Sequence, residues 1–236
     1  YVDAAAGQSG ILDERGPGQF AFWHQTFEEY LAAVALADDA CRDPAILIGK
    51  AGDPQFQEVF ALAVDEIALV RQNRKLALGF VRQLSHSDAA PLESVLHTSL
   101  RRAALCIAGH AWIEPSLANE ILERLVDAVQ HKPYQPLQKD LAIALRGRPN
   151  LVPSPALRDS LLALLSAEPG TNISDDQLAL SALRVLLNVD SPTASQRALY
   201  WDCLKGSDLS AQRTLAACGL VRCGEHDERV LLALSG

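Results

Sequence analysis

The sequence predicts an all-α fold, an α-solenoid of stacked helix pairs that follows one short β-hairpin at the N-terminus. Three observations favour this class. Helix start signals recur along most of the chain, and an Ala-rich helical segment returns after roughly 40 residues. A strong turn signal between two apolar runs near the N-terminus indicates the hairpin.

Residues 1–24 differ in pattern from the rest of the chain. Short apolar runs occupy residues 11–12 (IL) and 20–23 (FAFW), and the sequence DERGPG lies between them at 13–18. Gly and Pro interrupt regular structure, so this segment predicts a turn between two strands. We expect a β-hairpin here and no other strand pair in the chain.

A helical pattern begins at Thr26. Thr26 and Glu29 have the spacing of a capping box, in which each side chain binds a backbone N–H of the other residue. The helix should extend from residue 26 to about residue 38. Four apolar side chains fall on one of its faces at helical spacing, namely Phe27, Tyr30, Leu31 and Val34.

Later helix starts are marked by a capping side chain directly before Pro. These capping residues are Asp43, Asp53, Ser154 and Ser191. Ser174 and Gln177 have the spacing of a further capping box. Together with the apolar periodicity, these signals predict helices near residues 44–49, 54–70, 72–85, 89–108, 115–131, 135–147, 155–166, 175–188, 192–204, 209–222 and 226–234.

The Ala-rich segments set the period of the predicted repeat. Their central alanines are Ala104, Ala142, Ala182 and Ala216, separated by roughly 34 to 40 residues. Small side chains let neighbouring helices approach closely, while the adjacent Leu and Ile residues fill the seam. A period near this length with two helices per unit is typical of HEAT-like repeats. We therefore expect residues 41–236 to form such repeats.

Composition excludes several classes of function. The formal net charge is -8, so we expect neither a nucleic-acid partner nor binding to anionic lipid. No apolar run approaches the ~18 residues of a membrane span, and no secretion signal opens the chain. Five cysteines lie within helical patterns, which favours reduced, buried thiols in a cytoplasmic protein. The chain lacks Met, so we expect it to be part of a longer protein.

Residues 20–33 read FAFWHQTFEEYLAA, and this segment resembles the F-x-H-x-[ST]-F-[QE]-E-[YF]-x-A-A signature of NACHT ATPases. In that family the signature closes a winged-helix domain just before the C-terminal sensor repeats. The resemblance implies that residues 1–40 are the end of such a domain with its linking helix. The matching residues are Phe22, His24, Thr26, Phe27, Glu28, Glu29, Tyr30, Ala32 and Ala33.

The resemblance also implies a function. NACHT proteins are signalling ATPases of the STAND class. Their core binds ADP in the inactive state, and a ligand that binds the repeats releases this inhibition. Bacterial members often act in defence against phage. We therefore expect a protein ligand on the repeats, a second contact with the parent's own ATPase core, and oligomerisation of the parent on activation. ADP or ATP with Mg²⁺ would bind the full-length parent, with no cofactor in this segment.

Residue roles follow from the same resemblance. The signature histidine contacts the β-phosphate of ADP in the family, and it corresponds to His24 here. The alternative is that His24 packs under the hairpin and binds backbone. Phe22, Phe27 and Tyr30 would form the packing joint between the winged helix and the first repeat. Glu28 and Glu29 point about 100° apart on a helix, so they do not form a catalytic pair.

No phosphate-binding G-x-x-x-x-G-K-[ST] loop occurs in the chain, and we expect no catalytic activity of its own. Cys218, Cys223 and His226, with Cys203, lack regular zinc spacing and are interpreted as packing residues. The basic clusters at 71–75 and 101–102 are interpreted as solvated helix faces, with a groove that binds a nucleic-acid backbone or an acidic protein as the alternative.

Other interpretations remain open at this point. Trp112 and Trp201 are either core residues or exposed binding anchors. The histidines His86, His97, His110 and His131 are scattered singly along the chain. A stand-alone HEAT-repeat scaffold without a nucleotide switch is the alternative to a NACHT sensor. A HEAT-type DNA glycosylase conflicts with the acidic charge.

Overall fold

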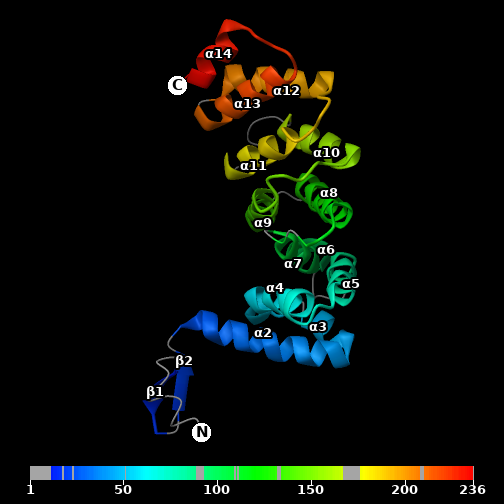
Figure 1. Ribbon diagram of the computed structural model, residues 1–236, viewed down its shortest axis with the longest axis vertical. Coiled ribbons are helices and arrows are strands. Elements are labelled where there is room, and N and C mark those ends of the chain that lie inside the picture. Colours follow the sequence, from blue (N-terminus) through cyan, green and yellow to red (C-terminus); the bar gives the residue numbers. More distant parts are fainter. Residues whose placement is uncertain are drawn as a thin grey trace. The chain divides into compact units, whose positions relative to one another are not determined.

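The computed structural model describes residues 12–17, 19–22, 24–50, 52–88, 93–108, 110, 112–131, 134–166, 176–207 and 210–235. These residues are mostly helical, which confirms the all-α prediction (Figure 1). The chain divides into two compact units, Tyr1–Pro91 and Leu92–Gly236, and each is described by itself. None of the described helices has the length and apolar character that crossing a bilayer requires.

The first unit opens with two short antiparallel strands, in which Leu12 lies opposite Phe22. Helices follow in the order that the sequence predicts. The predicted helix at 54–70 is present but changes its winding twice, from 3-10 through α to π. The elements are β1 (Leu12–Gly16), β2 (Gln19–Phe22), α2 (Gln25–Arg42), α3 (Pro44–Gly49), η1 (Pro54–Phe56), α4 (Gln57–Asp65), η2 (Glu66–Val70) and α5 (Arg74–Ser85).

The core of the first unit forms where α2 contacts α3, α4 and η2. On α2 the buried side chains are Ala33, Leu36, Ala37 and Ala40, which allow α4 to approach closely. The face noted in the sequence is different, because Phe27, Tyr30 and Leu31 are exposed. Periodicity marks an apolar face, but it does not show which side of the helix a neighbour covers.

The second unit contains the remaining helices. They are α6 (Glu93–Leu96), α7 (Thr98–Ile107), α8 (Pro115–His131), α9 (Gln135–Arg146), α10 (Pro155–Leu165), α11 (Asp176–Leu186), α12 (Ala194–Gly206), α13 (Ser210–Arg222) and α14 (Glu228–Ser235). The predicted helix at 89–108 is interrupted at His97, whose φ is 49°. Buried Glu93 then caps α7 by accepting from the backbone N–H of Ser99 at 2.9 Å.

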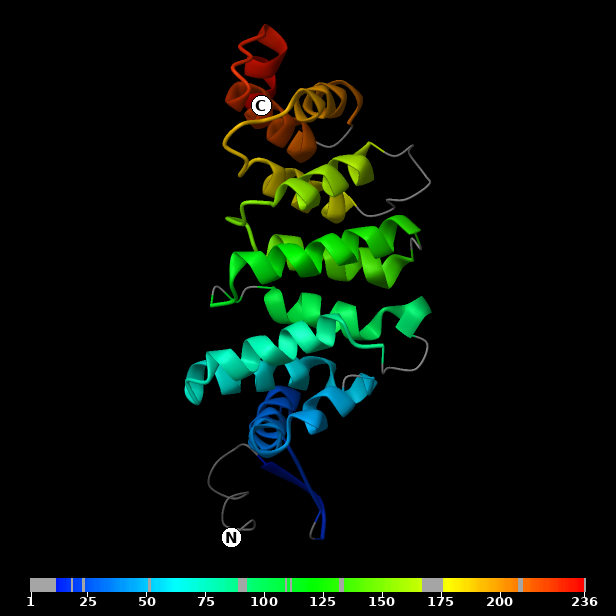
Figure 2. The same ribbon diagram turned by 90° about the vertical axis from the view of Figure 1, so that its right-hand side faces the viewer.

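Alternate helices of this unit pack in two rows, which lie side by side in Figure 1 and one behind the other in Figure 2. One row contains α7, α9, α11 and α13, each in contact with the next, and the other contains α8, α10 and α12. The four alanines that set the predicted period, Ala104, Ala142, Ala182 and Ala216, are all buried in the first row. These four small side chains are therefore part of the core of the second unit.

Side chains just beyond two helices of the first row bind backbone carbonyls at the end of the preceding helix of that row or in the loop that follows it. Arg148, after α9, donates from Nε to the carbonyl of Ile107 at 2.7 Å and from Nη1 to that of Ile113 at 3.2 Å. Asn188, after α11, donates to the carbonyls of Pro149 at 2.7 Å and Leu151 at 2.9 Å. The two side chains therefore link successive helix pairs at equivalent positions.

Most predicted helix starts are confirmed. Asp43 accepts from the backbone N–H of Ala45 at 3.0 Å, and Ser154 Oγ accepts from that of Leu157 at 3.0 Å. The start predicted at Ser191 is wrong by two residues, because Thr193 forms a capping box with Gln196 and fixes the first turn of α12 there. The capping box predicted at Ser174 lies outside the described residues.

Tyr200 of α12 is buried against α13, and burial raises its pKa to about 12. The Gln196 amide nearby is already engaged, accepting from the backbone N–H of Thr193 at 3.0 Å and donating to the carbonyl of Leu186 at 3.4 Å. The phenol oxygen lies buried without a hydrogen bond of good geometry among the described residues, although the Gln196 side chain beside it acts to lower its pKa. A buried hydroxyl in this state costs desolvation free energy and does not stabilise the native state at neutral pH.

Ionisation of Tyr200 should make the second unit less stable at high pH. The native pKa is raised above the unfolded value near 10, so the native state holds the proton more tightly. Stability is then lost as pH rises from about 10 to about 12, by on the order of 1–2 kcal/mol. We expect Tyr200→Phe to remove this component in urea titrations at several pH values. An equal alkaline loss in both proteins would contradict the assignment.

Candidate functional site

The first candidate site is the N-terminus of α2, where the structure makes His24 the capping residue. His24 has extended backbone, and its Nδ1 accepts from the backbone N–H of Thr26 at 3.4 Å and lies 3.0 Å from Thr26 Oγ1. The predicted capping box of Thr26 and Glu29 is therefore wrong. The helix begins at Gln25, and Glu29 instead accepts from the Gln25 side chain at 2.8 Å.

This cap determines which ring nitrogen of His24 can act as a donor. In the tautomer that lets Nδ1 accept from the N–H of Thr26, the neutral ring carries its proton on Nε2. The side chain is exposed, so Nε2–H can donate to a ligand. The helix N-terminus favours an anion there, although exposed Glu28 in the first turn offsets part of that attraction.

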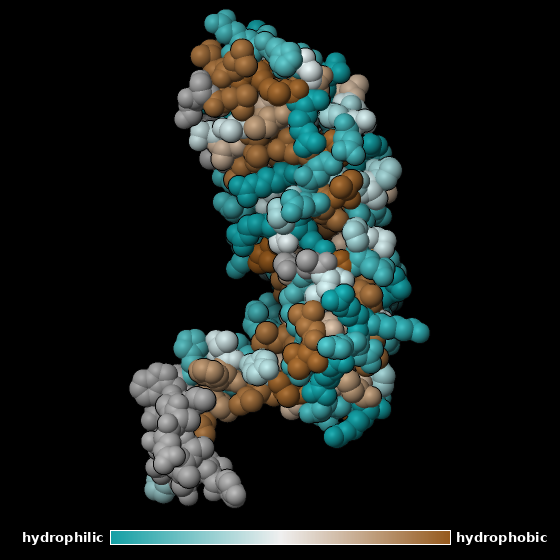
Figure 3. All heavy atoms as spheres, viewed as in Figure 1, coloured by the Kyte–Doolittle hydropathy of each residue, from teal (hydrophilic) through white to brown (hydrophobic). Residues whose placement is uncertain are grey.

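The other motif residues do not close around His24. Phe22 is half-buried, whereas Phe27 and Tyr30 are 46% and 47% exposed. Figure 3 shows hydrophobic surface along the first part of α2. The packing joint between winged helix and repeats therefore remains a prediction, and Trp23 lies outside the described residues.

The basic cluster at 71–75 is partly structural. Arg71 lies 2.5 Å from Asp38 on α2 and 3.6 Å from buried Glu66 on η2. The hydrogen bond from Arg71 lowers the pKa of Asp38, and the same bond raises the pKa of Arg71. Arg74 and Lys75 are exposed, as a solvated face requires. The sequence did not indicate the structural role of Arg71, because its partners Asp38 and Glu66 belong to other helical segments.

The prediction of a solvated face at Arg101 and Arg102 is wrong. Arg101 on α7 lies 2.6 Å from buried Asp140 on α9 and donates to Tyr134 Oη at 3.1 Å, while Arg102 is buried. Burial raises the pKa of Asp140 even though Arg101 acts in the opposite direction. Arg101 therefore links α7 to α9, and the burial of Arg102 leaves it unavailable to a phosphate backbone.

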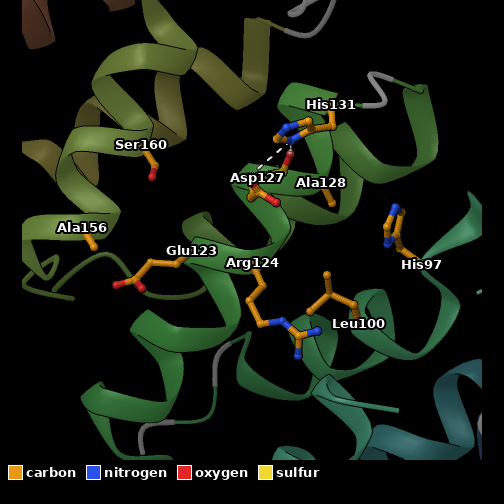
Figure 4. Close-up of a pocket in the computed structure, with 9 residues that line it drawn as sticks. All are labelled: His97, Leu100, Glu123, Arg124, Asp127, Ala128, His131, Ala156 and Ser160. Atoms are coloured by element: carbon orange, nitrogen blue, oxygen red, sulfur yellow. Dashed lines mark hydrogen bonds and ion pairs between the residues drawn. The ribbon is translucent and has the colours of Figure 1, made fainter. Parts of the chain in front are cut away.

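The second candidate site is a groove of about 450 Å³ between α7, α8 and α10 (Figure 4). Its lining combines apolar side chains with acidic side chains, a basic side chain and neutral hydrogen-bonding groups. His131 lies 3.3 Å from Asp127, and Ser160 faces them from α10. Its lining comprises His97, Leu100, Glu123, Arg124, Asp127, Ala128, His131, Ala156 and Ser160.

This groove brings together two histidines that are far apart in the sequence and were interpreted as scattered. His97 comes from the start of α7 and His131 from the end of α8. The mixed lining suits a polar protein segment with a few apolar side chains. The sequence carried no signal for it, because its residues belong to three helices and form no motif.

The remaining candidates are the cysteines and two tryptophans. All five cysteines are free, and Cys106 is buried, but Cys41 is exposed, contrary to the expectation of buried thiols. The described residues contain no group of three or more His, Cys, Asp or Glu side chains placed to hold a metal ion. Trp112 lies beside His110, and Trp201 lies under the Lys205 ammonium, each half-buried.

Comparison with protein-family models, with curated proteins and with solved structures finds no match to this chain.

Proposed function

We propose that this chain is the sensor segment of a NACHT-type STAND ATPase, in which HEAT-like repeats bind a protein trigger and release the inhibition of an ADP-bound core. The observation that carries the proposal is the N-terminus of α2. There a signature that resembles the NACHT motif places an exposed histidine at a helix cap, directly before the helical repeats. Defence against phage is the biological setting that the resemblance favours.

The geometry of His24 supports the phosphate role. Its capping contact engages Nδ1, and in that tautomer the Nε2 proton is left for an acceptor outside the helix. A phosphate oxygen is such an acceptor, and a bond to charged oxygen is stronger than one to water. When bound in the parent, ADP supplies the phosphate charge; this chain supplies one donor and the positive end of a helix.

The two rows of the second unit support the role of the repeats. A stack of helix pairs joined through alanine seams can change its packing in small steps, and its grooves offer a protein ligand a long surface. Ligand binding would then favour the open state only as far as it binds that state more tightly than the closed one.

The first test of the proposal is the sequence of the parent polypeptide. A P-loop preceding this segment on the same chain is expected. A parent without any nucleotide-binding domain would exclude the switch and favour the alternative, a HEAT-repeat scaffold that only binds partners.

Loss of the His24 imidazole should weaken retention of ADP. In the full-length parent, we expect His24→Ala to speed ADP dissociation by about tenfold, the effect of one charge-assisted hydrogen bond of roughly 1.5 kcal/mol, and to raise basal signalling. Stopped-flow release of a fluorescent ADP analogue measures the rate. His86→Ala, an exposed histidine at the end of α5, is the matched control. Equal rates for the wild type and His24→Ala would refute the phosphate role.

A further inference from the structure

We propose that the groove between α12, α13 and α14 is a docking site for an acidic, amphipathic protein segment. The groove has a volume of about 320 Å³ and is lined by three apolar and three basic side chains. They are Leu204, Lys205, Arg213, Arg229, Leu232 and Ala233. This inference gives the chemistry of the protein that would bind the repeats. It rests on the proposed function only where it identifies this partner with the protein trigger.

The apolar side of the groove includes α14, a short helix with several exposed leucines. α14 buries Val230, but Leu231, Leu232 and Leu234 are 54%, 64% and 42% exposed; Leu232 lines the groove, and the other two lie on the same helix outside its lining. Figure 3 shows the hydrophobic surface gathered over α14, at the upper left of the view. Exposed apolar surface rimmed by polar groups is typical of a site that another protein covers.

The charged side of the groove selects the partner. Lys205 and Arg213 are exposed, and the Lys205 ammonium is held 5.6 Å from the centroid of the Trp201 ring. Arg229 is partly neutralised by Asp227 at 3.7 Å. None of the described residues that line the groove is acidic. The rim of the groove is therefore positive although the chain as a whole has a net charge of -8. A positive rim favours a partner that carries carboxylates.

A peptide fits these features better than other polyanions. Nucleic acid and anionic membranes carry a dense negative charge, which the overall charge of -8 repels, and they need many cations in a row. An amphipathic segment needs only two or three carboxylates, and its apolar face can cover the exposed leucines. The groove offers both kinds of contact side by side.

The test measures binding of a fluorescein-labelled helical peptide to the whole chain by fluorescence anisotropy. The peptide has leucines at helical spacing and glutamates on its flanks, and a control peptide has lysine in place of each glutamate. We expect micromolar binding of the acidic peptide that weakens with added salt, and at least about tenfold weaker binding of the lysine peptide.

Variants locate the site. The double variant Lys205→Glu/Arg213→Glu and the single variant Leu232→Asp should each weaken binding by about tenfold or more. Arg74→Glu/Lys75→Glu, which reverses two exposed charges on α5, should leave binding unchanged. All these side chains are exposed, so unchanged circular dichroism melting curves are expected to show that each variant is folded.

Two outcomes would overturn the proposal. One is equal binding of both peptides, or acidic-peptide binding that the groove variants leave intact. The other is a preference for phosphatidylglycerol vesicles or single-stranded DNA over the acidic peptide, with the same variants abolishing it. Neither outcome bears on ADP retention, so a failure here is distinguishable from a failure of the proposed function.

Discussion

Replacing Arg148 with Ala is expected to lower the free energy of unfolding of the second unit by about 2–4 kcal/mol. Arg148 donates to the carbonyls of Ile107 and Ile113, two residues that are almost fully buried. The Ile107 carbonyl belongs to the last turn of α7, where no further turn of that helix can satisfy it. Removal of the guanidinium therefore leaves two buried acceptors without their donors.

The matched control for Arg148 is Arg146, an exposed arginine in the last turn of α9. Arg146→Ala should change stability by less than about 0.5 kcal/mol. Arg148→Lys is expected to recover only part of the loss, because a single ammonium cannot reproduce the two separated N–H groups. Urea unfolding followed by circular dichroism gives all three values. Equal stabilities for Arg148→Ala and Arg146→Ala would show that the Arg148 link is energetically unimportant.

Replacing Gly219 with Ala should destabilise the same unit by about 2 kcal/mol. A Cβ at this position would lie 2.5 Å from Cε2 and 2.7 Å from Cδ2 of Tyr200. The Tyr200 ring is 1% exposed and has no open space to move into, so one helix must shift. Overpacking of this kind costs about 3 kcal/mol, which exceeds the gain of about 1 kcal/mol from the better helix former.

Gly79 provides the control for that substitution. It is exposed in the middle of α5, and nothing lies within 4 Å of an added Cβ. Gly79→Ala should therefore stabilise the first unit by about 0.5–1 kcal/mol through helix propensity alone. Thermal unfolding should show opposite shifts for the two variants. A stabilising Gly219→Ala would mean that α12 and α13 are not packed through the Tyr200 ring.

Local signals in the sequence predicted local structure well. Asp43 and Ser154 cap helices because a capping bond joins residues two or three apart, which a sequence displays directly. The buried alanines were predicted because the period of a repeat is also visible in one chain. His24 was the exception, since capping by a histidine ring competes with the more usual cap at Thr26.

Contacts between helices were predicted poorly. The ion pair of Arg101 with Asp140 depends on which faces of α7 and α9 meet, and no local pattern fixes that. The exposed face of α2 and the groove that joins His97 to His131 depend on tertiary packing in the same way. One signal for such contacts is present in the sequence. Arg148 and Asn188 occupy matching positions after Ala-rich helices one repeat apart, and both bind backbone carbonyls.

The central proposal is that His24 and the repeats behind it belong to a nucleotide switch. It is tested most directly by measuring the nucleotide released when the purified full-length protein is denatured. We expect close to one ADP per polypeptide in the resting protein, and a large loss of it in His24→Ala. A resting protein that carries no adenine nucleotide would contradict the account and leave a helical binding scaffold in its place.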